Sequence, residues 1–145
     1  ETMVKSLKLL GIKTPKIAFL SASELVMENM ESTVVAQNLK EWAKENIRDA
    51  SFSGPLALDL IISREAALKK GLENDPVAGL SNGIVVPEIV SGNTLYKSLV
   101  YFAGGCAAGI VLGAKVPVLL TSRADPPEAR LASIALASIL SDEMP

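Results

Sequence analysis

The sequence contains no histidine and a single cysteine, Cys106. Without histidine, a Ser-His-Asp triad and a conventional His/Cys zinc site are excluded within these 145 residues. One cysteine excludes an internal disulfide and suits a reducing compartment, so we expect a cytoplasmic protein. Cys106 lies among glycines and alanines in GGCAAGIV, and we expect a buried packing residue rather than a nucleophile.

Long apolar runs and an excess of positive charge are also lacking. Apolar residues make up 49% of the chain, but none of the apolar runs reaches the ~18 uninterrupted residues of a membrane span. The 14 basic and 16 acidic residues give a net charge of −2, with no basic stripe to follow a nucleic-acid backbone. We therefore expect a soluble protein that binds neither membranes nor nucleic acid, and the length predicts one domain.

Short apolar runs alternate with amphipathic stretches, which is typical of a layered α/β domain. The most regular helix is expected in STVVAQNLKEWAKENI, where Val34, Val35, Leu39, Trp42 and Ile47 recur at helical spacing. Ser63 and Gly71 are expected to begin and end another helix. Strands are expected over residues 16–21, 84–86, 107–113 and 117–122, and further helices end at residue 11 or cover residues 93–103 and 126–140.

In open α/β sheets, ligands bind where strands pass into helices at the carboxyl edge. Three such junctions carry suggestive residues: SGPLALD over 53–59, VPEIVSGN over 86–93 and TSRAD over 121–125. The first two also have purely structural explanations. Residues 53–55 read as an ordinary turn with Asp59 as a local cap, and Asn93 is a preferred N-cap preceded by Gly92.

The third junction divides into two parts. Asp125 is expected to be an N-cap followed by Pro126 at the first helical position, with Glu128 placed to bond back. Arg123 has no such structural explanation. A guanidinium beside a helix start can bind phosphate or carboxylate, and Ser122 adds a hydroxyl there. We therefore expect an anion site at Ser122 and Arg123.

Three separated motifs now make a resemblance visible: SGPLALD, VPEIVSGNTLYKSLVYFAGG and AGIVLGAKVPVLLTSRAD. Together they resemble the phosphate acetyl/butyryltransferase family, and most closely its butyryl branch. The resemblance covers the carboxyl-terminal half of such enzymes, so we expect residues 1–145 to be that half. The amino-terminal half would then precede Glu1, and we expect the chain to be a piece of a longer protein. It implies a layered αβα sandwich like that of isocitrate and isopropylmalate dehydrogenases, as one of two domains in a homodimer.

The resemblance also implies the chemistry. Acyl-CoA and phosphate would be substrates, giving acyl phosphate and CoA, with neither a metal nor a tightly bound cofactor. Arg123 would bind phosphate and Ser122 would orient or polarise the thioester carbonyl. Gly92 and Asn93 would line the same cleft, and Gly54 and Asp59 would face it from the SGPLALD segment.

The resemblance does not identify the residue that acts as general base. The acetyl branch carries an aspartate seven residues after the motif serine, where this sequence has Ala129. Asp59 and Glu128 are the candidates, and we favour Asp59 because capping competes for Glu128.

Two other readings remain. The same fold could be a non-catalytic module that binds CoA or phosphate or only dimerises, and the segment before Glu1 would discriminate the two. A dehydrogenase is disfavoured because a carboxylate cluster for a metal-bound hydroxyacid is missing. A hydratase-like domain further upstream is compatible with the resemblance, and acyl-chain length cannot be read from the sequence.

Overall fold

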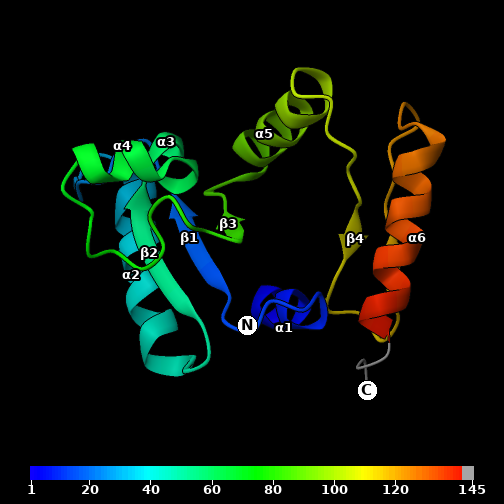
Figure 1. Ribbon diagram of the computed structural model, residues 1–145, viewed down its shortest axis with the longest axis horizontal. Coiled ribbons are helices and arrows are strands. Elements are labelled where there is room, and N and C mark those ends of the chain that lie inside the picture. The colour runs from blue at the N-terminus through cyan, green and yellow to red at the C-terminus, as the bar shows by residue number, and fades with distance from the viewer. Residues whose placement is uncertain (142–145) are drawn as a thin grey trace. The chain divides into compact units, whose positions relative to one another are not determined.

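A computed structural model describes residues 1–141 of the chain (Figure 1). Its elements alternate between helix and strand, as expected for the α/β class. They are α1 (Thr2–Leu9), β1 (Lys16–Leu20), α2 (Glu31–Asn46), β2 (Ser51–Leu56), α3 (Leu58–Ile62), α4 (Arg64–Lys69), β3 (Gly83–Val85), α5 (Ile89–Tyr101), β4 (Ile110–Val111), β5 (Val118–Leu119) and α6 (Pro127–Ser141).

These residues form two compact units instead of the single domain that the length predicts. The first unit contains Glu1 and Met3–Ser91, and the second contains Thr2 and residues 92–141. The boundary falls inside α5, whose first turn belongs to the first unit.

The first unit is built on a three-stranded parallel sheet of order β2-β1-β3. Ile17 of β1 pairs with Phe52 of β2 on one side and with Gly83 of β3 on the other. Successive side chains of a strand point to opposite faces, so each face of this sheet carries its own apolar set.

Helices cover both faces of the sheet, which gives three layers. On one face, Ile17, Phe19 and Phe52 pack with Val4 of α1 and with the alanines of α2. The other face has a second buried cluster that includes α3 and α4: Ala18, Leu56, Leu60, Ile61, Ala67, Val77 and Ala78. The layered α/β architecture expected from the sequence is confirmed for this unit.

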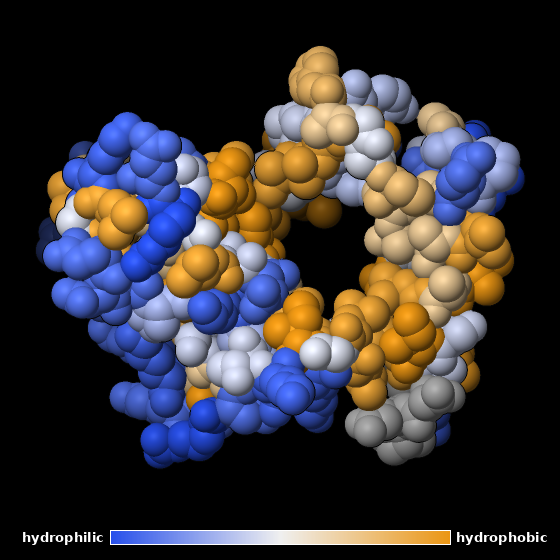
Figure 2. Space-filling view, in the orientation of Figure 1, coloured by the Kyte–Doolittle hydropathy of each residue, from blue (hydrophilic) through white to orange (hydrophobic). Residues whose placement is uncertain are grey.

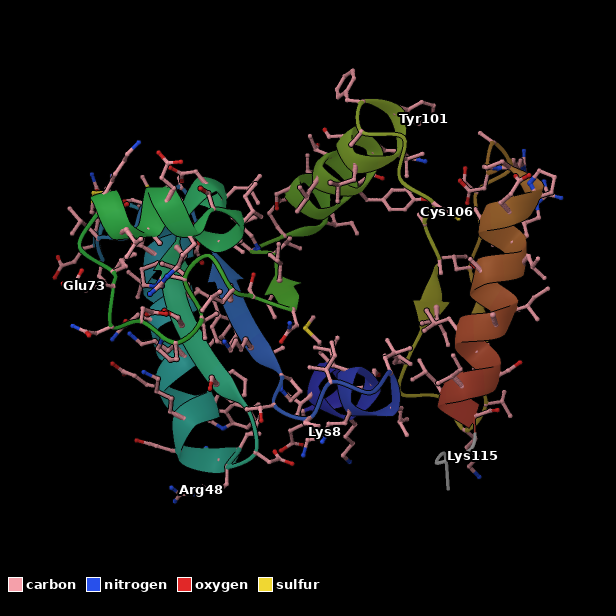
Figure 3. All side chains as sticks on the ribbon, viewed as in Figure 1. Lys8, Arg48, Glu73, Tyr101, Cys106 and Lys115 are labelled. Carbon is pink, nitrogen blue, oxygen red and sulfur yellow. The ribbon has the colours of Figure 1, made fainter. Side chains whose placement is uncertain are left out.

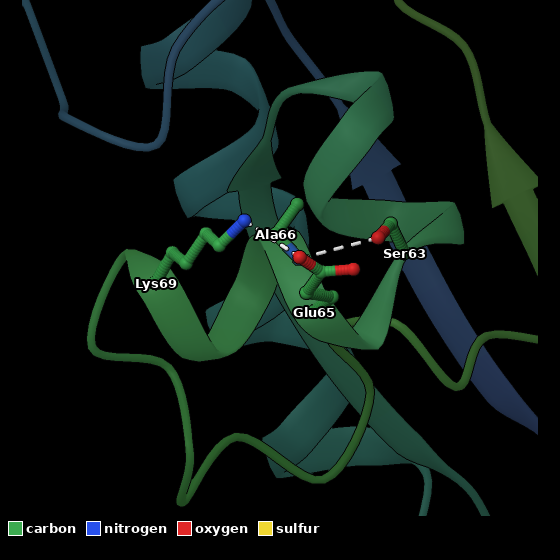
Figure 4. A network of polar contacts seen from close by, with 4 residues as sticks. All are labelled: Ser63, Glu65, Ala66 and Lys69. Carbon is green, nitrogen blue, oxygen red and sulfur yellow. Dashed lines mark hydrogen bonds and ion pairs between the residues drawn. The ribbon is translucent and has the colours of Figure 1, made fainter.

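The helix start expected at Ser63 (Figure 4) and the helix end expected at Gly71 are both confirmed. The Ser63 hydroxyl oxygen accepts a hydrogen bond from the Ala66 amide at 3.2 Å, and Lys69 pairs with Glu65 at 2.6 Å on the exposed face of α4. The chain leaves the helix through Gly71, whose φ of 76° is a left-handed conformation that suits glycine.

Two expectations about the first unit are wrong. Residues 53–55 are not a turn but part of β2, where Gly54 is buried because β1 passes so close that a Cβ would lie 2.7 Å from the Phe19 Cβ. On α2, the helix is present but its buried face is Thr33, Ala36 and Ala43. Val35, Leu39 and Trp42 are 40–48% exposed, because the close-packed face of α2 uses its smallest side chains.

The second unit is built around an antiparallel hairpin. Ile110 of β4 pairs with Leu119 of β5, and α6 packs against both strands. The Gly109 amide donates to the Ser133 hydroxyl of α6 at 3.0 Å. The strands expected over 107–113 and 117–122 are therefore present, but each is only two residues long.

Candidate functional site

Ser122 and Asp125 close a tight turn immediately before α6. The Asp125 carboxylate accepts a hydrogen bond from the Ser122 amide at 2.6 Å, and the Asp125 amide donates to the Ser122 carbonyl at 3.1 Å. The Ser122 hydroxyl oxygen accepts from the Ala124 amide at 3.3 Å, which leaves its own hydrogen free to donate. This turn holds Ser122 and Arg123 on the exposed side of the loop.

The N-cap expected at Asp125 is wrong. Helix α6 begins one residue later, at Pro127, and the Ala129 amide donates to the Pro126 carbonyl. The Asp125 carboxylate serves the Ser122 turn instead, because a side chain three residues after an amide competes for it locally. Glu128 is exposed in the first turn of α6, and within residues 1–141 its carboxylate has no hydrogen-bonding partner.

Arg123 is exposed in the same turn and bonds to neither Asp125 nor Glu128. Within the described part of the chain its guanidinium forms no hydrogen bond and no ion pair. A planar guanidinium offers several donors in a geometry that matches phosphate and carboxylate oxygens. Its donors are therefore available to an anion.

Tyr96 of α5 joins this turn and was not identified from the sequence. Its hydroxyl lies 3.4 Å from the Asp125 carboxylate. The carboxylate that accepts from the Ser122 amide therefore also contacts α5. Partial burial, and then the negative charge of Asp125, raise the pKa of the Tyr96 phenol above its ordinary value, so it stays protonated and donates. The available signal was its position three residues after Asn93, one helical turn along GNTLYK.

Helix α5 begins earlier than expected, at Ile89 instead of Asn93. The Glu88 carboxylate caps it by accepting from the amides of Val90 and Ser91 at 2.5 and 2.6 Å. The side chain of Ser91, and then these two amides, lower the pKa of Glu88. The expected N-cap at Asn93 is therefore wrong. Gly92 and Asn93 lie inside the helix, four and three residues before Tyr96 respectively, and so on its face.

A pocket of about 160 Å³ lies within the second unit, beside this turn. Its walls come from α5, the loop after it, the turn before α6 and the first turn of α6: Tyr96, Val100, Gly104, Gly105, Cys106, Ala107, Asp125, Pro126, Glu128 and Ala129. Cys106 is exposed here, labelled in Figure 3, and is not the buried packing residue that we expected. Its neighbours in the loop are glycines and alanines, which provide too little side-chain volume to cover it.

Gly54 and Asp59 belong to the first unit. Gly54 is buried in β2, where the approach of β1 already accounts for a glycine. Asp59 is exposed in the first turn of α3, which directly follows the carboxyl end of β2. It lies near an ion pair in which Lys70 Nζ and Glu24 Oε1 are 2.8 Å apart. The hydrogen bond that Lys70 donates to Glu24, and in smaller part the charge of Asp59, raise the pKa of Lys70.

Two features are absent from the described residues. Residues 1–141 contain no group of three or more His, Cys, Asp or Glu side chains arranged to hold a metal ion. None of the helices formed by these residues is both long and apolar enough to cross a membrane.

Comparisons with known proteins agree with one another. A family model described as "Phosphate acetyl/butaryl transferase" matches residues 1–138. A probable phosphate butyryltransferase of Bacillus subtilis is 47% identical over 134 residues, which are 92% of this chain and 44% of that protein. A phosphate acetyltransferase of Thermotoga maritima is 41% identical over 140 residues, 96% of this chain and 47% of that protein.

Solved structures give the same result. A branched-chain phosphotransacylase from Enterococcus faecalis superposes with a TM-score of 0.86 at 39% identity, covering 97% of this chain and 50% of that one. A phosphotransacetylase from Staphylococcus aureus superposes with a TM-score of 0.70 at 26% identity. The chain spans about half the length of the relatives it matches.

Proposed function

Because this chain belongs to the phosphate acetyl/butyryl transferase family, we propose that it is the part of a phosphate acyltransferase that binds phosphate through Arg123. The enzyme moves a short acyl group, of the butyryl or acetyl type, between CoA and inorganic phosphate. The reaction needs no resident metal and no tightly bound cofactor, since CoA and phosphate are themselves the substrates. The observation that carries this proposal is the exposed, unengaged guanidinium of Arg123 in the turn before α6.

The chemistry requires charge to be gathered at two places. One is the attacking phosphate, and the other is the carbonyl oxygen of the thioester, which becomes negative in the tetrahedral transition state. Arg123 neutralises the phosphate with paired N–H donors. The Ser122 hydroxyl keeps its hydrogen because it only accepts from Ala124 within the turn. It therefore donates to the thioester carbonyl.

We propose Glu128 as the base that takes the proton of the CoA thiol when acyl phosphate reacts with CoA. Two observations support Glu128 over Asp59, which the sequence favoured. The helix capping that competed for Glu128 is not formed, and Glu128 lines the same pocket as Asp125, the partner of Ser122. Asp59 is instead held beside the Glu24–Lys70 ion pair. In the reverse direction the protonated acid returns the proton to the leaving thiolate.

The exposed apolar side chains of the second unit support a proposal about what covers this unit in the complete enzyme. Figure 2 shows apolar residues over part of its visible surface, and Leu120 and Leu131 are 69% and 68% exposed. Helix α5 has no buried residue. We propose that this surface is covered by the half of the family's length that this chain does not include, as a segment of the same polypeptide. The complete enzyme works as a homodimer in the cytoplasm, where acyl-CoA is available and Cys106 stays reduced.

The test is an assay of CoA release from butyryl-CoA by the polypeptide that joins this chain to the other half. We expect turnover that depends on phosphate and is lost when residues 1–145 are assayed alone, since half of the cleft is then missing. Arg123→Ala is expected to lower kcat/KM by ~10²–10³, the usual effect of removing one prepositioned donor. Arg123→Lys, which keeps the charge but loses the paired donors, is expected to lie between the two.

Arg48→Ala is the matched control. Arg48 is an exposed arginine at the end of α2, in the first unit, and the described residues give it no ion pair (Figure 3). An Arg123→Ala protein as active as this control would disprove the phosphate-binding role. Absence of phosphate-dependent turnover would disprove the acyltransferase and favour a non-catalytic module. A larger loss in Asp59→Asn than in Glu128→Gln would return the base to Asp59.

A further inference from the structure

The pocket of the second unit is not built for phosphate. Most of its wall is apolar or small: Val100, Gly104, Gly105, Cys106, Ala107 and Ala129. A phosphate placed there would lose hydration without gaining enough donors, which is costly for a charged group. An apolar cavity of about 150 Å³ takes up benzene, which has six carbon atoms. The 160 Å³ of this pocket therefore suit an apolar group of about that size.

One carboxylate connects this pocket to the candidate reaction centre. Asp125 lines the pocket, its Oδ2 accepts from the Ser122 amide at 2.6 Å, and its Oδ1 lies 3.4 Å from the Tyr96 hydroxyl. Tyr96 is itself a wall residue. A thioester whose carbonyl lies at Ser122 therefore has the pocket within reach of the carbon chain attached to that carbonyl.

We propose that this pocket binds the hydrocarbon chain of the acyl group, and that Cys106 and Ala129 limit the chain length. The proposal rests on the acyltransferase function above and adds the preferred substrates to it. The volume has room for the three carbons beyond the carbonyl of a butyryl group and for branched chains of similar size. Acetyl leaves most of it unfilled. The enzyme therefore prefers butyryl and branched short acyl groups to acetyl.

The two limiting residues are inferred from their size and placement. Ala129 is 4% exposed on the first turn of α6, where its single methyl leaves the pocket open. Cys106 is exposed on the opposite element, the loop after α5, so a larger side chain there does not disturb a packed core. A leucine adds a net three non-hydrogen atoms at Ala129 and two at Cys106, which occupy about half and about a third of a cavity that holds six carbon atoms.

The experiment compares kcat/KM for acetyl-, butyryl- and hexanoyl-CoA in the joined polypeptide. Cys106→Leu is expected to lower the butyryl-to-acetyl ratio at least tenfold, since each excluded methylene in an apolar pocket changes specificity by ~10–200-fold. Cys106→Ala is expected to keep the ratio or to improve hexanoyl-CoA. Ala108→Leu is the control, because Ala108 is exposed two residues away and does not line the pocket. Ala129→Leu is a second test from the helix side.

A second readout follows the thiol itself. Labelling of Cys106 by N-ethylmaleimide, measured by mass spectrometry of its peptide, is expected to be slowed more by butyryl-CoA than by acetyl-CoA, and least by CoA. An unchanged butyryl-to-acetyl ratio in Cys106→Leu, in a protein whose turnover depends on Arg123, would overturn the acyl pocket and leave the proposed function standing. No turnover with any chain length would overturn both. Equal protection by CoA and butyryl-CoA would also contradict the proposal.

Discussion

The two units differ in how they cover their apolar side chains. The first unit places one buried cluster on each face of its sheet, with Leu60, Ala67 and Val77 fully enclosed. In the second unit, buried positions of α6 are Ala129, Ser133 and Leu140, while α5 has none. At ~25 cal/mol per Å² of buried apolar area, a unit without a core has little to offset the entropy of ordering its chain. The residues proposed for chemistry are thus carried by the part that depends on a partner.

The largest expected effect comes from separating the two units. Residues 3–91 expressed alone are expected to unfold cooperatively in urea, because both clusters lie within them. Residues 92–145 alone are expected to show no cooperative transition and to bind a hydrophobic dye. Circular dichroism and dye fluorescence make the measurement. A cooperative transition in residues 92–145 would show that the second unit needs no cover.

An intermediate effect is expected from a glycine within the first unit. Gly79 has φ 69°, and a Cβ there would lie 2.3 Å from the Arg64 Cα, so Gly79→Ala combines backbone strain with a clash. We expect a loss of about 3 kcal/mol in the free energy of unfolding, measured in urea. Gly71→Ala is the matched control: its φ is also positive, but the added Cβ meets nothing within 4 Å. A loss of only ~1–2 kcal/mol is expected there.

Equal losses in the two glycine variants would show that the close approach to Arg64 can relax. Such relaxation is not expected, because the Arg64 guanidinium also donates to the carbonyls of Glu73 and Ala78 at 2.6 and 2.9 Å. These hydrogen bonds hold the loop that follows α4 against Arg64, the first residue of α4.

The smallest expected effect concerns Glu88, at the boundary between the units. Its pKa is lowered by hydrogen bonds from Ser91 and Val90, so the ionised form stabilises the start of α5. This contribution is present above the ordinary pKa of 4.5 and is lost as the pH falls through the lower value in the folded protein. Glu88→Gln is therefore expected to be less stable than the parent at pH 7, and the difference is expected to shrink as the pH falls below 4.5. A difference that does not change with pH would mean that the charge of Glu88 does not act here.

Several parts of the fold follow directly from local sequence. Helices α2 and α4 and the parallel strands β1 and β3 were predictable because spacing of apolar residues, the Ser63 cap and Gly71 act over a few residues. Strand β2 was missed, because Gly54 and Pro55 are typical turn residues. The Ser122–Arg123 pair was predictable as a candidate for the same reason, since a basic residue before a helix start is visible in the chain itself. These features need no knowledge of what packs against them.

Other parts were misjudged where two local partners compete. Asp125 had the sequence of an N-cap, but its carboxylate bonds to the Ser122 amide. Asn93 was the better cap by residue type, yet Glu88, five positions earlier, accepts from the amides of Val90 and Ser91. Each alternative was compatible with the same residues, and which one forms depends on small differences in turn geometry.

Residue order alone thus settles the α/β alternation, the helix ends marked by Ser63 and Gly71, and the presence of an arginine and a serine before the last helix. Tertiary structure decides that Gly54 lies too close to Phe19 of the neighbouring strand to carry a side chain. It also decides that the Tyr96 hydroxyl contacts Asp125 and that Cys106 lines a pocket. Periodicity and capping act within one or two helical turns. Burial, and contacts between residues 29 positions apart such as Tyr96 and Asp125, depend on how separate elements pack.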